Sequence, residues 1–371
     1  MKVEKEGYRV AVVGASSLLG KEIVTVLEER SFPVSRLVTF EADEEEAELP
    51  IVDLREGLHA SVQDADVSEA ELDFAFLATH PAAPESGAAT GKPSFLRAAE
   101  SFAVRGTEGR RTHCRVIDLT GEELSETAGE SVGATPKKVV SIPFLDRRFP
   151  AHQTEPGVSS FYVSAHPAVI VISSLLLRLA ARFPLKSAVA QLFTSASEIG
   201  SRGIEELQKQ TVNLLSFQKI PRQIFGAQLA FNLLPRLGRV EHTELTNLEA
   251  RARQQLRQYL GNRVPLPALR LFQVPVFYSL ALSLYVETTT PVPPEAAGAA
   301  LQGERIRLRR LSQEAPSQLE VTGSSDILID CVTSDAEHPT GIWVWAVADN
   351  VRLAAVNAVE IAESLRERVR P

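Results

Sequence analysis

The chain has 371 residues, of which 44% are hydrophobic and 23% charged, so it is long enough for two globular domains. Its formal net charge of -8 at pH 7 argues against a nucleic-acid partner or an anionic membrane, because both need clustered positive charge. The longest apolar run, Ala168–Leu177, contains two serines and is far shorter than the roughly 20 residues of a membrane span. No amino-terminal signal precedes the first predicted strand, so the sequence predicts a cytoplasmic protein.

Strands and helices alternate over the first third of the chain. The β-branched run Tyr8–Val13 ends at a glycine, which is typical of a buried parallel strand, and Leu18–Arg30 carries apolar residues at helical spacing. Further strands are predicted at Arg36–Phe40, Asp73–Ala78 and Arg115–Leu119, and a helix near Phe95–Ala103. Strands that alternate with helices form βαβ units, so this region predicts a Rossmann-type α/β domain with a parallel sheet.

The pattern changes after about residue 140, where the predicted strands become longer. Helices are predicted at Ala168–Phe183, Ser201–Phe217, Leu245–Leu260 and Val351–Arg368. Strands are predicted at Ser159–Ser164, Ala188–Ser197, Leu269–Phe277, Leu280–Thr288 and Gly341–Ala348. Longer strands with helices segregated between them predict a second domain of the α+β class.

The segment Gly14–Gly20 (GASSLLG) lies directly between the first strand and the first helix. Gly14 permits a tight turn, and Gly20 permits close packing of the helix on the strand. The N–H groups at the start of such a helix can hold a pyrophosphate. Ser17 stands where many such turns carry a glycine, so its side chain either narrows the approach of a phosphate or donates a hydrogen bond to it. A turn without a ligand is the alternative interpretation.

Glu41 ends the second predicted strand, about twenty residues past the glycine turn. An acidic side chain at that position accepts a hydrogen bond from a ribose hydroxyl, which favours NAD over NADP. More acidic residues follow between 43 and 48, and clustered acid beside a polyanion costs affinity. A solvated acidic loop is therefore an equally good interpretation of this stretch.

Several stretches, taken together, resemble aspartate-semialdehyde dehydrogenase and its relatives from about residue 8 to the carboxyl end. The matching segments are Gly14–Gly20, Glu28–Val34, Val116–Leu119, Ser195–Gln210, Gln228–Gly238 and Asp349–Ala362. No single segment is decisive, but their order and spacing over the whole chain indicate a true family resemblance rather than coincidence.

The resemblance also implies the domain organisation. The last helix is expected to return to the cofactor domain, which then comprises residues 1–145 and 349–371, and residues 146–348 form an α+β substrate and dimerisation domain of a homodimer. The expected cofactor-binding residues are Gly14, Ser16, Ser17, Leu18, Leu19, Gly20, Glu41 and Asn350.

In the family that the chain resembles, a cysteine thiolate attacks the aldehyde, NADP usually takes the hydride, and phosphate releases the acyl phosphate. This chemistry needs a nucleophile, a histidine that manages protons and an arginine that holds the substrate carboxylate. The resemblance places the cysteine position at Pro167, with His166 or Val169 as alternatives. It places the arginine position at Gln273 and the histidine position at Leu280. No catalytic residue is intact, so the expected protein binds NAD(P) but lacks the family activity.

Four further residues are candidates for a chemical role. Thr194 lies in the segment where the family carries a catalytic glutamine. His166 is interpreted as a turn histidine before a proline, with ligand contact or an unusual base as the alternatives. Cys114 and Cys331 lie in apolar runs and are expected to be reduced, buried hydrophobes. The histidines have no metal-ligand spacing, so no metal site is expected.

Two other functions stay open on the sequence alone. One is an active NAD(P)-dependent semialdehyde dehydrogenase of amino-acid biosynthesis with a rearranged site. The other is a nicotinamide-dependent reductase that transfers hydride directly and needs no thiol. The missing thiol is the feature that bears on the family reaction, because an acyl thioester requires a sulfur nucleophile, whereas direct hydride transfer does not.

Overall fold

The computed structural model describes residues 7–40, 59–61, 72–78, 114–120, 139–150, 161–235, 244–309 and 313–366. The chain divides into two compact units. Unit 1 comprises Met1–Ala165 and Ala355–Pro371, and unit 2 comprises His166–Ala354. Glu41, the acidic stretch that follows it and the predicted helix Phe95–Ala103 lie outside the described residues. In the described part of the chain, no helix is both long and apolar enough to cross a membrane.

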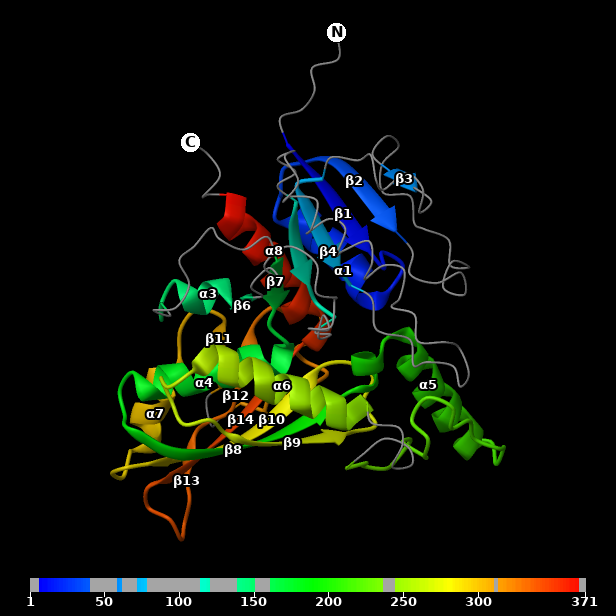
Figure 1. The fold of residues 1–371 in the computed structure, drawn as a ribbon. Coiled ribbons are helices and arrows are strands. Elements are labelled where there is room, and N and C mark those ends of the chain that lie inside the picture. Colours follow the sequence, from blue (N-terminus) through cyan, green and yellow to red (C-terminus); the bar gives the residue numbers. More distant parts are fainter. Residues whose placement is uncertain are drawn as a thin grey trace, which may run out of the picture. The chain divides into compact units, whose positions relative to one another are not determined.

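Unit 1 contains a seven-stranded parallel sheet in the order β3-β2-β1-β4-β5-β7-β6 (Figure 1). Its strands are β1 (Tyr8–Val13), β2 (Val34–Phe40), β3 (His59–Ser61), β4 (Phe74–Leu77), β5 (Arg115–Asp118), β6 (Val139–Ser141) and β7 (Phe161–Ser164). Strand order reverses between β1 and β4, which is the point where open α/β sheets bind ligands beyond the carboxyl ends of their strands. The predicted Rossmann-type class of the first domain is confirmed.

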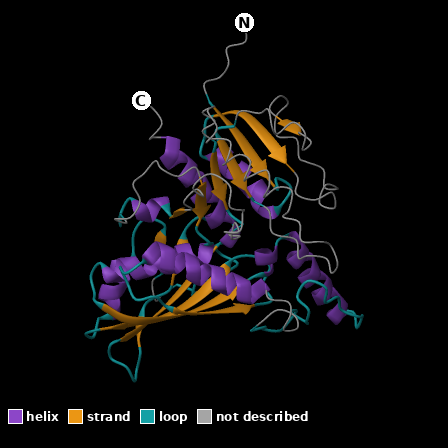
Figure 2. Ribbon diagram, viewed as in Figure 1, coloured by secondary structure: helices purple, strands orange, loops and turns teal. Residues whose placement is uncertain are grey.

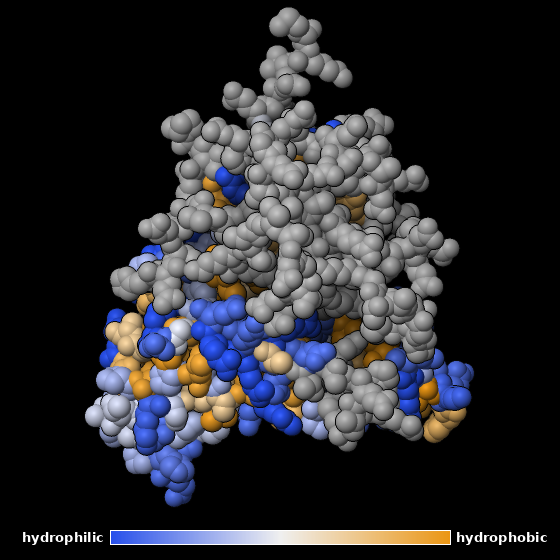
Figure 3. Space-filling view, in the orientation of Figure 1, coloured by the Kyte–Doolittle hydropathy of each residue, from blue (hydrophilic) through white to orange (hydrophobic). Residues whose placement is uncertain are grey.

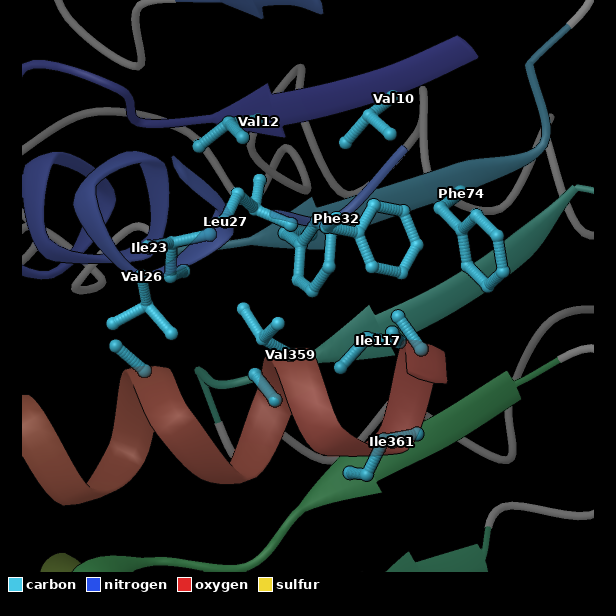
Figure 4. Close-up of a cluster of buried hydrophobic side chains, with 14 of the residues drawn as sticks. Val10, Val12, Ile23, Val26, Leu27, Phe32, Phe74, Ile117, Val359 and Ile361 are labelled. Carbon is cyan, nitrogen blue, oxygen red and sulfur yellow. The ribbon is translucent and has the colours of Figure 1, made fainter. Parts of the chain in front are cut away.

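Helices α1 (Leu18–Glu29) and α8 (Asn350–Arg366) pack on one face of this sheet. Figure 4 shows their apolar residues meeting those of the strands, with Ile23 and Val26 of α1 and Val359 of α8 in one cluster. The side chain of Arg30 joins the two helices, because its Nη2 atom lies 2.6 Å from Oε2 of Glu363. A short helix, α3 (Pro143–Asp146), follows β6.

Unit 2 contains a mixed sheet in the order β11-β12-β14-β10-β8-β9, and β13 pairs with β14. Its strands are β8 (Leu185–Thr194), β9 (Ala268–Gln273), β10 (Leu280–Thr288), β11 (Ile306–Leu308), β12 (Ile327–Ile329), β13 (Thr333–Ser334) and β14 (Gly341–Ala348). Its helices are α4 (Pro167–Ala180), a 3₁₀ turn at Ala196–Ile199, α5 (Ser201–Leu215), α6 (Glu244–Leu260) and α7 (Pro294–Leu301). The long central strand β10 is antiparallel to both neighbours, which confirms the α+β class of this domain.

Helices α4, α6 and α7 lie on one face of the unit 2 sheet (Figures 1 and 2). Almost every side chain of α4 is buried, which is the pattern of a central helix. In the space-filling view of Figure 3 the surface over α6 is largely hydrophilic, and Arg253 and Arg257 of this helix are exposed. The opposite face of the sheet carries aromatic side chains that are only partly buried, among them Phe193 and Trp343.

The edge strand β9 is capped by side chains of α6. Oε2 of Glu249 accepts a hydrogen bond from the Leu271 N–H (3.0 Å), and Nη2 of Arg253 donates to the Leu269 carbonyl oxygen (2.7 Å). Glu249 and Arg253 also pair with each other one helical turn apart. Two side chains thus satisfy main-chain groups that an adjacent strand would otherwise take.

The predicted strand Leu269–Phe277 was too long. The structure ends β9 at Gln273 and turns the chain before β10 begins at Leu280. Pro275 lies inside that turn and has no N–H for a ladder, and Ser279 adopts a positive φ of 72°, which ends a strand. Because Val274–Tyr278 is otherwise apolar, the sequence pattern predicts a strand as far as Phe277 despite Pro275 and Ser279.

Candidate functional site

The glycine turn of unit 1 has the backbone geometry that its two glycines allow. Gly14 has a φ of 78°, and its N–H donates to the Phe40 carbonyl oxygen at 2.7 Å. A Cβ atom on Gly20 would lie 2.0 Å from the Gly14 carbonyl oxygen, which is far inside any tolerable contact. Gly14 therefore provides the left-handed conformation, and Gly20 provides the close approach of helix and turn.

Ser17 is the N-cap of α1, and its hydroxyl points into the turn. Its Oγ accepts a hydrogen bond from the Gly20 N–H at 3.0 Å. The hydroxyl proton is shared between the carbonyl oxygens of Gly14 (2.7 Å) and Ala78 (3.1 Å). Because Ala78 follows β4, the Ser17 side chain bridges the carboxyl ends of β1 and β4 at the reversal of strand order. Its hydroxyl is thus engaged by the protein itself.

Two main-chain donors at this helix start remain available for an anion. In the described part of the chain, the N–H groups of Leu18 and Leu19 have no hydrogen-bond acceptor, whereas the Gly20 N–H is capped. Ser16 lies in the same turn with its hydroxyl oxygen shielded from solvent. The turn therefore fits a pyrophosphate through two N–H groups and the positive end of the helix dipole.

Asn350, the remaining predicted cofactor-binding residue, belongs to unit 2 and begins α8. Its Oδ1 accepts from the Ser197 hydroxyl (3.0 Å) and from the Ser279 N–H (3.1 Å). Its Nδ2 donates to Oε2 of Glu198 at 3.3 Å. Asn350 is 5% exposed, and its side chain is hydrogen-bonded to residues of its own unit.

His166 caps the start of α4 and pairs with the same glutamate. Its Nδ1 accepts from the Ala168 N–H (3.1 Å), so the ring proton of the neutral form resides on Nε2. Nε2 lies 2.7 Å from Oε1 of Glu198. The main-chain N–H of His166 donates to Oε1 of Gln255 at 2.8 Å. The turn position predicted for His166 is therefore accompanied by a glutamate contact that the sequence did not predict.

The positions at which the resemblance expects catalytic groups hold side chains without that chemistry. Pro167 is the first residue of α4, and Val169 is fully buried. Gln273 is fully buried at the end of β9, and its Nε2 donates to the Thr194 carbonyl oxygen at 3.0 Å. Leu280 is 1% exposed and is paired with β14 as the first residue of β10.

Both cysteines lie away from the start of α4 along the chain, and burial disfavours their thiolates. Burial, with a smaller contribution from the charge of Asp73, raises the pKa of the Cys114 thiol to about 12. Burial and the neighbouring Asp330 also raise the pKa of Cys331, which is less deeply buried. Neither thiol is prepared for nucleophilic attack.

The roles of Glu198 and Ser197 were not predicted, although both lie in the segment Ser195–Gln210 that carries part of the family resemblance. Nothing local marks Glu198 as a partner of His166, because 32 residues separate the two. The buried Ser279 was also missed, and its positive φ is invisible in an apolar run. In the described residues, no group of three or more metal-ligating side chains gathers in one place.

A parallel sheet with a glycine turn at its strand reversal, followed by a mixed α+β unit, defines a two-domain protein of the dehydrogenase architecture. The family model described as semialdehyde dehydrogenase, NAD binding domain, matches residues 9–97. The model described as semialdehyde dehydrogenase, dimerisation domain, matches residues 176–353. The chain belongs to the semialdehyde dehydrogenase family.

Relatives of known name agree with this assignment over nearly the whole chain. A USG-1 protein homolog from Pseudomonas aeruginosa is 27% identical over 360 residues, which cover 96% of this chain and 97% of the relative. The aspartate-semialdehyde dehydrogenase of Aquifex aeolicus is 25% identical, with 97% and 98% covered. The structure of a probable aspartate-semialdehyde dehydrogenase from Pseudomonas aeruginosa superposes with a TM-score of 0.77 at 25% identity, covering 98% of this chain and 100% of that one.

Proposed function

We propose that the chain binds a nicotinamide dinucleotide and does not catalyse the phosphorylating oxidation of a semialdehyde. Binding is supported by the match to a NAD-binding domain and by the N–H groups of Leu18 and Leu19 at the glycine turn, which have no acceptor among the described residues. Those two residues, with Gly14 and Gly20 shaping the turn, would hold the pyrophosphate. The bound nicotinamide would supply a hydride acceptor or donor. Its role here is that of a bound effector in a binding or regulatory protein.

The observation that carries the loss of activity is the absence of a thiol from the start of α4. The chain has two cysteines, and both lie in other segments. Proline at position 167 has no group that can attack a carbonyl carbon. Removal of a covalent nucleophile and its base leaves only binding and orientation, which fall short of an intact site by several orders of magnitude.

The residues at the other expected catalytic positions also argue against the family activity. Gln273 carries no charge for a substrate carboxylate, and its amide is already bonded to the main chain of Thr194. Leu280 cannot accept a proton. A rearranged site would need His166 as its base, yet both ring nitrogens of His166 have partners. This arrangement disfavours an active semialdehyde dehydrogenase with a rearranged site, and it gives a thiol-independent reductase no ready proton donor.

Activity is tested by phosphate-dependent formation of NAD(P)H from aspartate semialdehyde, and by the reverse reaction. A cysteine-containing relative and its Cys→Ala variant set the upper and lower limits of the assay. We expect turnover no higher than that of the Cys→Ala variant. Turnover clearly above it would contradict the proposal, and a covalent adduct on Cys114 or Cys331 formed during turnover would identify an unforeseen nucleophile.

Nucleotide binding is tested separately by calorimetry and thermal shift with NAD⁺ and NADP⁺. A ligand at 100 times its dissociation constant adds about 2.7 kcal/mol to the stability of the form that binds it. We expect stabilisation by NAD⁺ exceeding that by NADP⁺, because the carboxylate of Glu41 would repel the extra phosphate. The Glu41→Ala variant is expected to narrow that difference. No shift with millimolar concentrations of either nucleotide would exclude a dinucleotide site.

We also propose that the protein is a homodimer joined through the face of the unit 2 sheet that lies opposite α4. The matched dimerisation model covers this sheet, and the face opposite α4 carries Phe193 stacked on Phe272 (5.6 Å between centroids) and Tyr285 against Trp343 (4.9 Å), while Val321 packs over part of that face. Trp343 remains 38% exposed, which is unusual for tryptophan in a monomer. Light scattering is expected to report a dimer for the wild type and monomers for Trp343→Arg. A monomeric wild type, or an unaffected variant dimer, would exclude this interface.

A further inference from the structure

The chain passes between its two units at two places. The first passage is at Ala165–His166, where β7 gives way to α4, and the second is at Ala354–Ala355, inside α8. Two connections of this kind can act as independent tethers or as one paired hinge. Which of the two applies depends on whether the connecting segments are joined to each other.

On the unit 2 side, one carboxylate joins both connecting segments. Oε1 of Glu198 contacts Nε2 of His166, the first residue after the first passage (2.7 Å). Oε2 of Glu198 accepts from Nδ2 of Asn350, at the start of α8 just before the second passage (3.3 Å). The side chains of His166 and Glu198 are only 16% and 10% exposed. Hydrogen bonds to a shielded carboxylate are among the stronger ones in proteins.

On the unit 1 side, an amide joins the same two segments. Nδ2 of Asn357 on α8 donates to Oγ of Ser164, the last residue of β7 (2.9 Å), and to the Ser141 carbonyl oxygen (3.0 Å). Asn357 is 2% exposed, so breaking these bonds would leave buried polar groups unsatisfied. Each unit thus joins the incoming and outgoing segments through one polar side chain that is largely shielded from solvent.

We propose that Glu198 and Asn357 are positioning residues that hold the two connections together and make them a single stiff hinge. The pairing of His166 with Glu198 then has a mechanical role rather than a catalytic one. This interpretation accounts for both features that a catalytic pair would not need. Nδ1 of His166 is used to cap α4, and the second carboxylate oxygen is used on α8 rather than left for a ligand. The proposal does not depend on whether a nucleotide binds.

Hydrogen exchange tests the coupling of the two connecting segments. The Ile170 N–H, bonded to the His166 carbonyl oxygen, reports the first turn of α4, and the Leu353 N–H, bonded to the Asp349 carbonyl oxygen, reports that of α8. In Glu198→Gln we expect both amides to exchange roughly tenfold faster, because the shared acceptor is weakened. Acceleration of only one of these amides, or of neither, would overturn the proposal.

The matched control is Glu206→Gln on α5. Glu206 is 4% exposed, lies in the same unit and accepts N–H groups of Ile224 (2.8 Å) and Phe225 (3.1 Å), but it contacts neither connecting segment among the described residues. Its substitution is expected to cost stability while leaving exchange at the starts of α4 and α8 unchanged relative to global unfolding. If it accelerates them as Glu198→Gln does, the coupling is not specific to the hinge.

A distance measurement tests the mechanical consequence, which a purely local role would not change. Spin labels at the exposed positions Glu28→Cys on α1 and Gln208→Cys on α5 report on unit 1 and unit 2, with Cys331→Ser as background. The distribution of distances between the labels is expected to widen in Glu198→Gln and in Asn357→Leu, but not in Glu206→Gln. If Glu198→Gln does not fold, His166→Asn keeps a capping side chain and removes the Glu198 contact. Distributions as narrow as that of the wild type in these variants would refute the paired hinge.

Discussion

Ser17→Gly separates two roles that a serine can have at a phosphate turn. In the structure the Ser17 hydroxyl caps the Gly20 N–H and bonds the carbonyl oxygens of Gly14 and Ala78. The substitution frees one more N–H for a pyrophosphate. A hydrogen bond to a charged acceptor contributes about 1.5 kcal/mol, so NAD⁺ should bind about tenfold tighter.

The same substitution is expected to destabilise unit 1. Glycine is nearly as good an N-cap as serine, but the lost side-chain bond to the Ala78 carbonyl oxygen costs about 1 kcal/mol, which lowers the melting temperature of the ligand-free protein by about 2–4 °C. The two effects have opposite signs and are measured by calorimetry with NAD⁺ and by thermal unfolding without it.

Ser17→Ala is the control that locates the cause of tighter binding. Alanine also frees the Gly20 N–H but keeps a Cβ atom at the turn. Equal gains in affinity for the Ala and Gly variants would assign the effect to the released donor, and a gain for Gly alone would assign it to steric relief. Weaker binding by both variants would refute the reasoning, since it would mean that the hydroxyl leaves the turn and contacts the phosphate.

Three further outcomes follow from the structure. Gly20→Ala is expected to prevent stable folding of unit 1, because its Cβ would meet main-chain oxygen at 2.0 Å; soluble protein with unchanged unfolding would contradict this geometry. Cys331 is expected to react with a thiol reagent at pH 8 before Cys114, whose pKa is raised to about 12 by burial, and peptide mapping that finds the reverse order would contradict the burial of Cys114. Hydrogen bonds from Trp343 and His338 lower the pKa of Asp335 to about 2, below its unfolded value near 4. The stabilisation is therefore present above pH 4 and is lost as the pH falls toward 2, where Trp343 fluorescence should change in the wild type but not in Asp335→Asn.

The architecture of unit 1 could be predicted because its signals are local. The turn at Gly14–Gly20 requires glycines at two fixed positions between a strand and a helix. Both glycines lie in one short stretch of sequence, so the pattern predicts the turn directly. Predicted helix ends were less accurate. The helix predicted to run to Phe183 ends at Ala180, because the last turn before Pro184 loosens.

The polar network of unit 2 could not be predicted, because it is made by residues far apart in the chain. Asn350 and Glu198 are separated by 152 positions, and the carboxylate reaches His166 only because α4, α8 and the 3₁₀ turn meet within one unit. The sequence predicts Asn350 in a cofactor site and His166 in a turn. No local pattern indicates that the carboxylate of Glu198 contacts both residues.

The capping of β9 by α6 constrains how copies of this protein can associate. The Leu271 N–H and the Leu269 carbonyl oxygen are already bonded to Glu249 and Arg253. These main-chain groups of the edge strand are therefore not available to pair with a strand of another molecule. The unit 2 sheet therefore cannot continue into the sheet of a second molecule through β9. The main chain of Gln273 is bonded to that of Leu234 as well, so the protein's own chain keeps β9 from pairing with a strand of another copy.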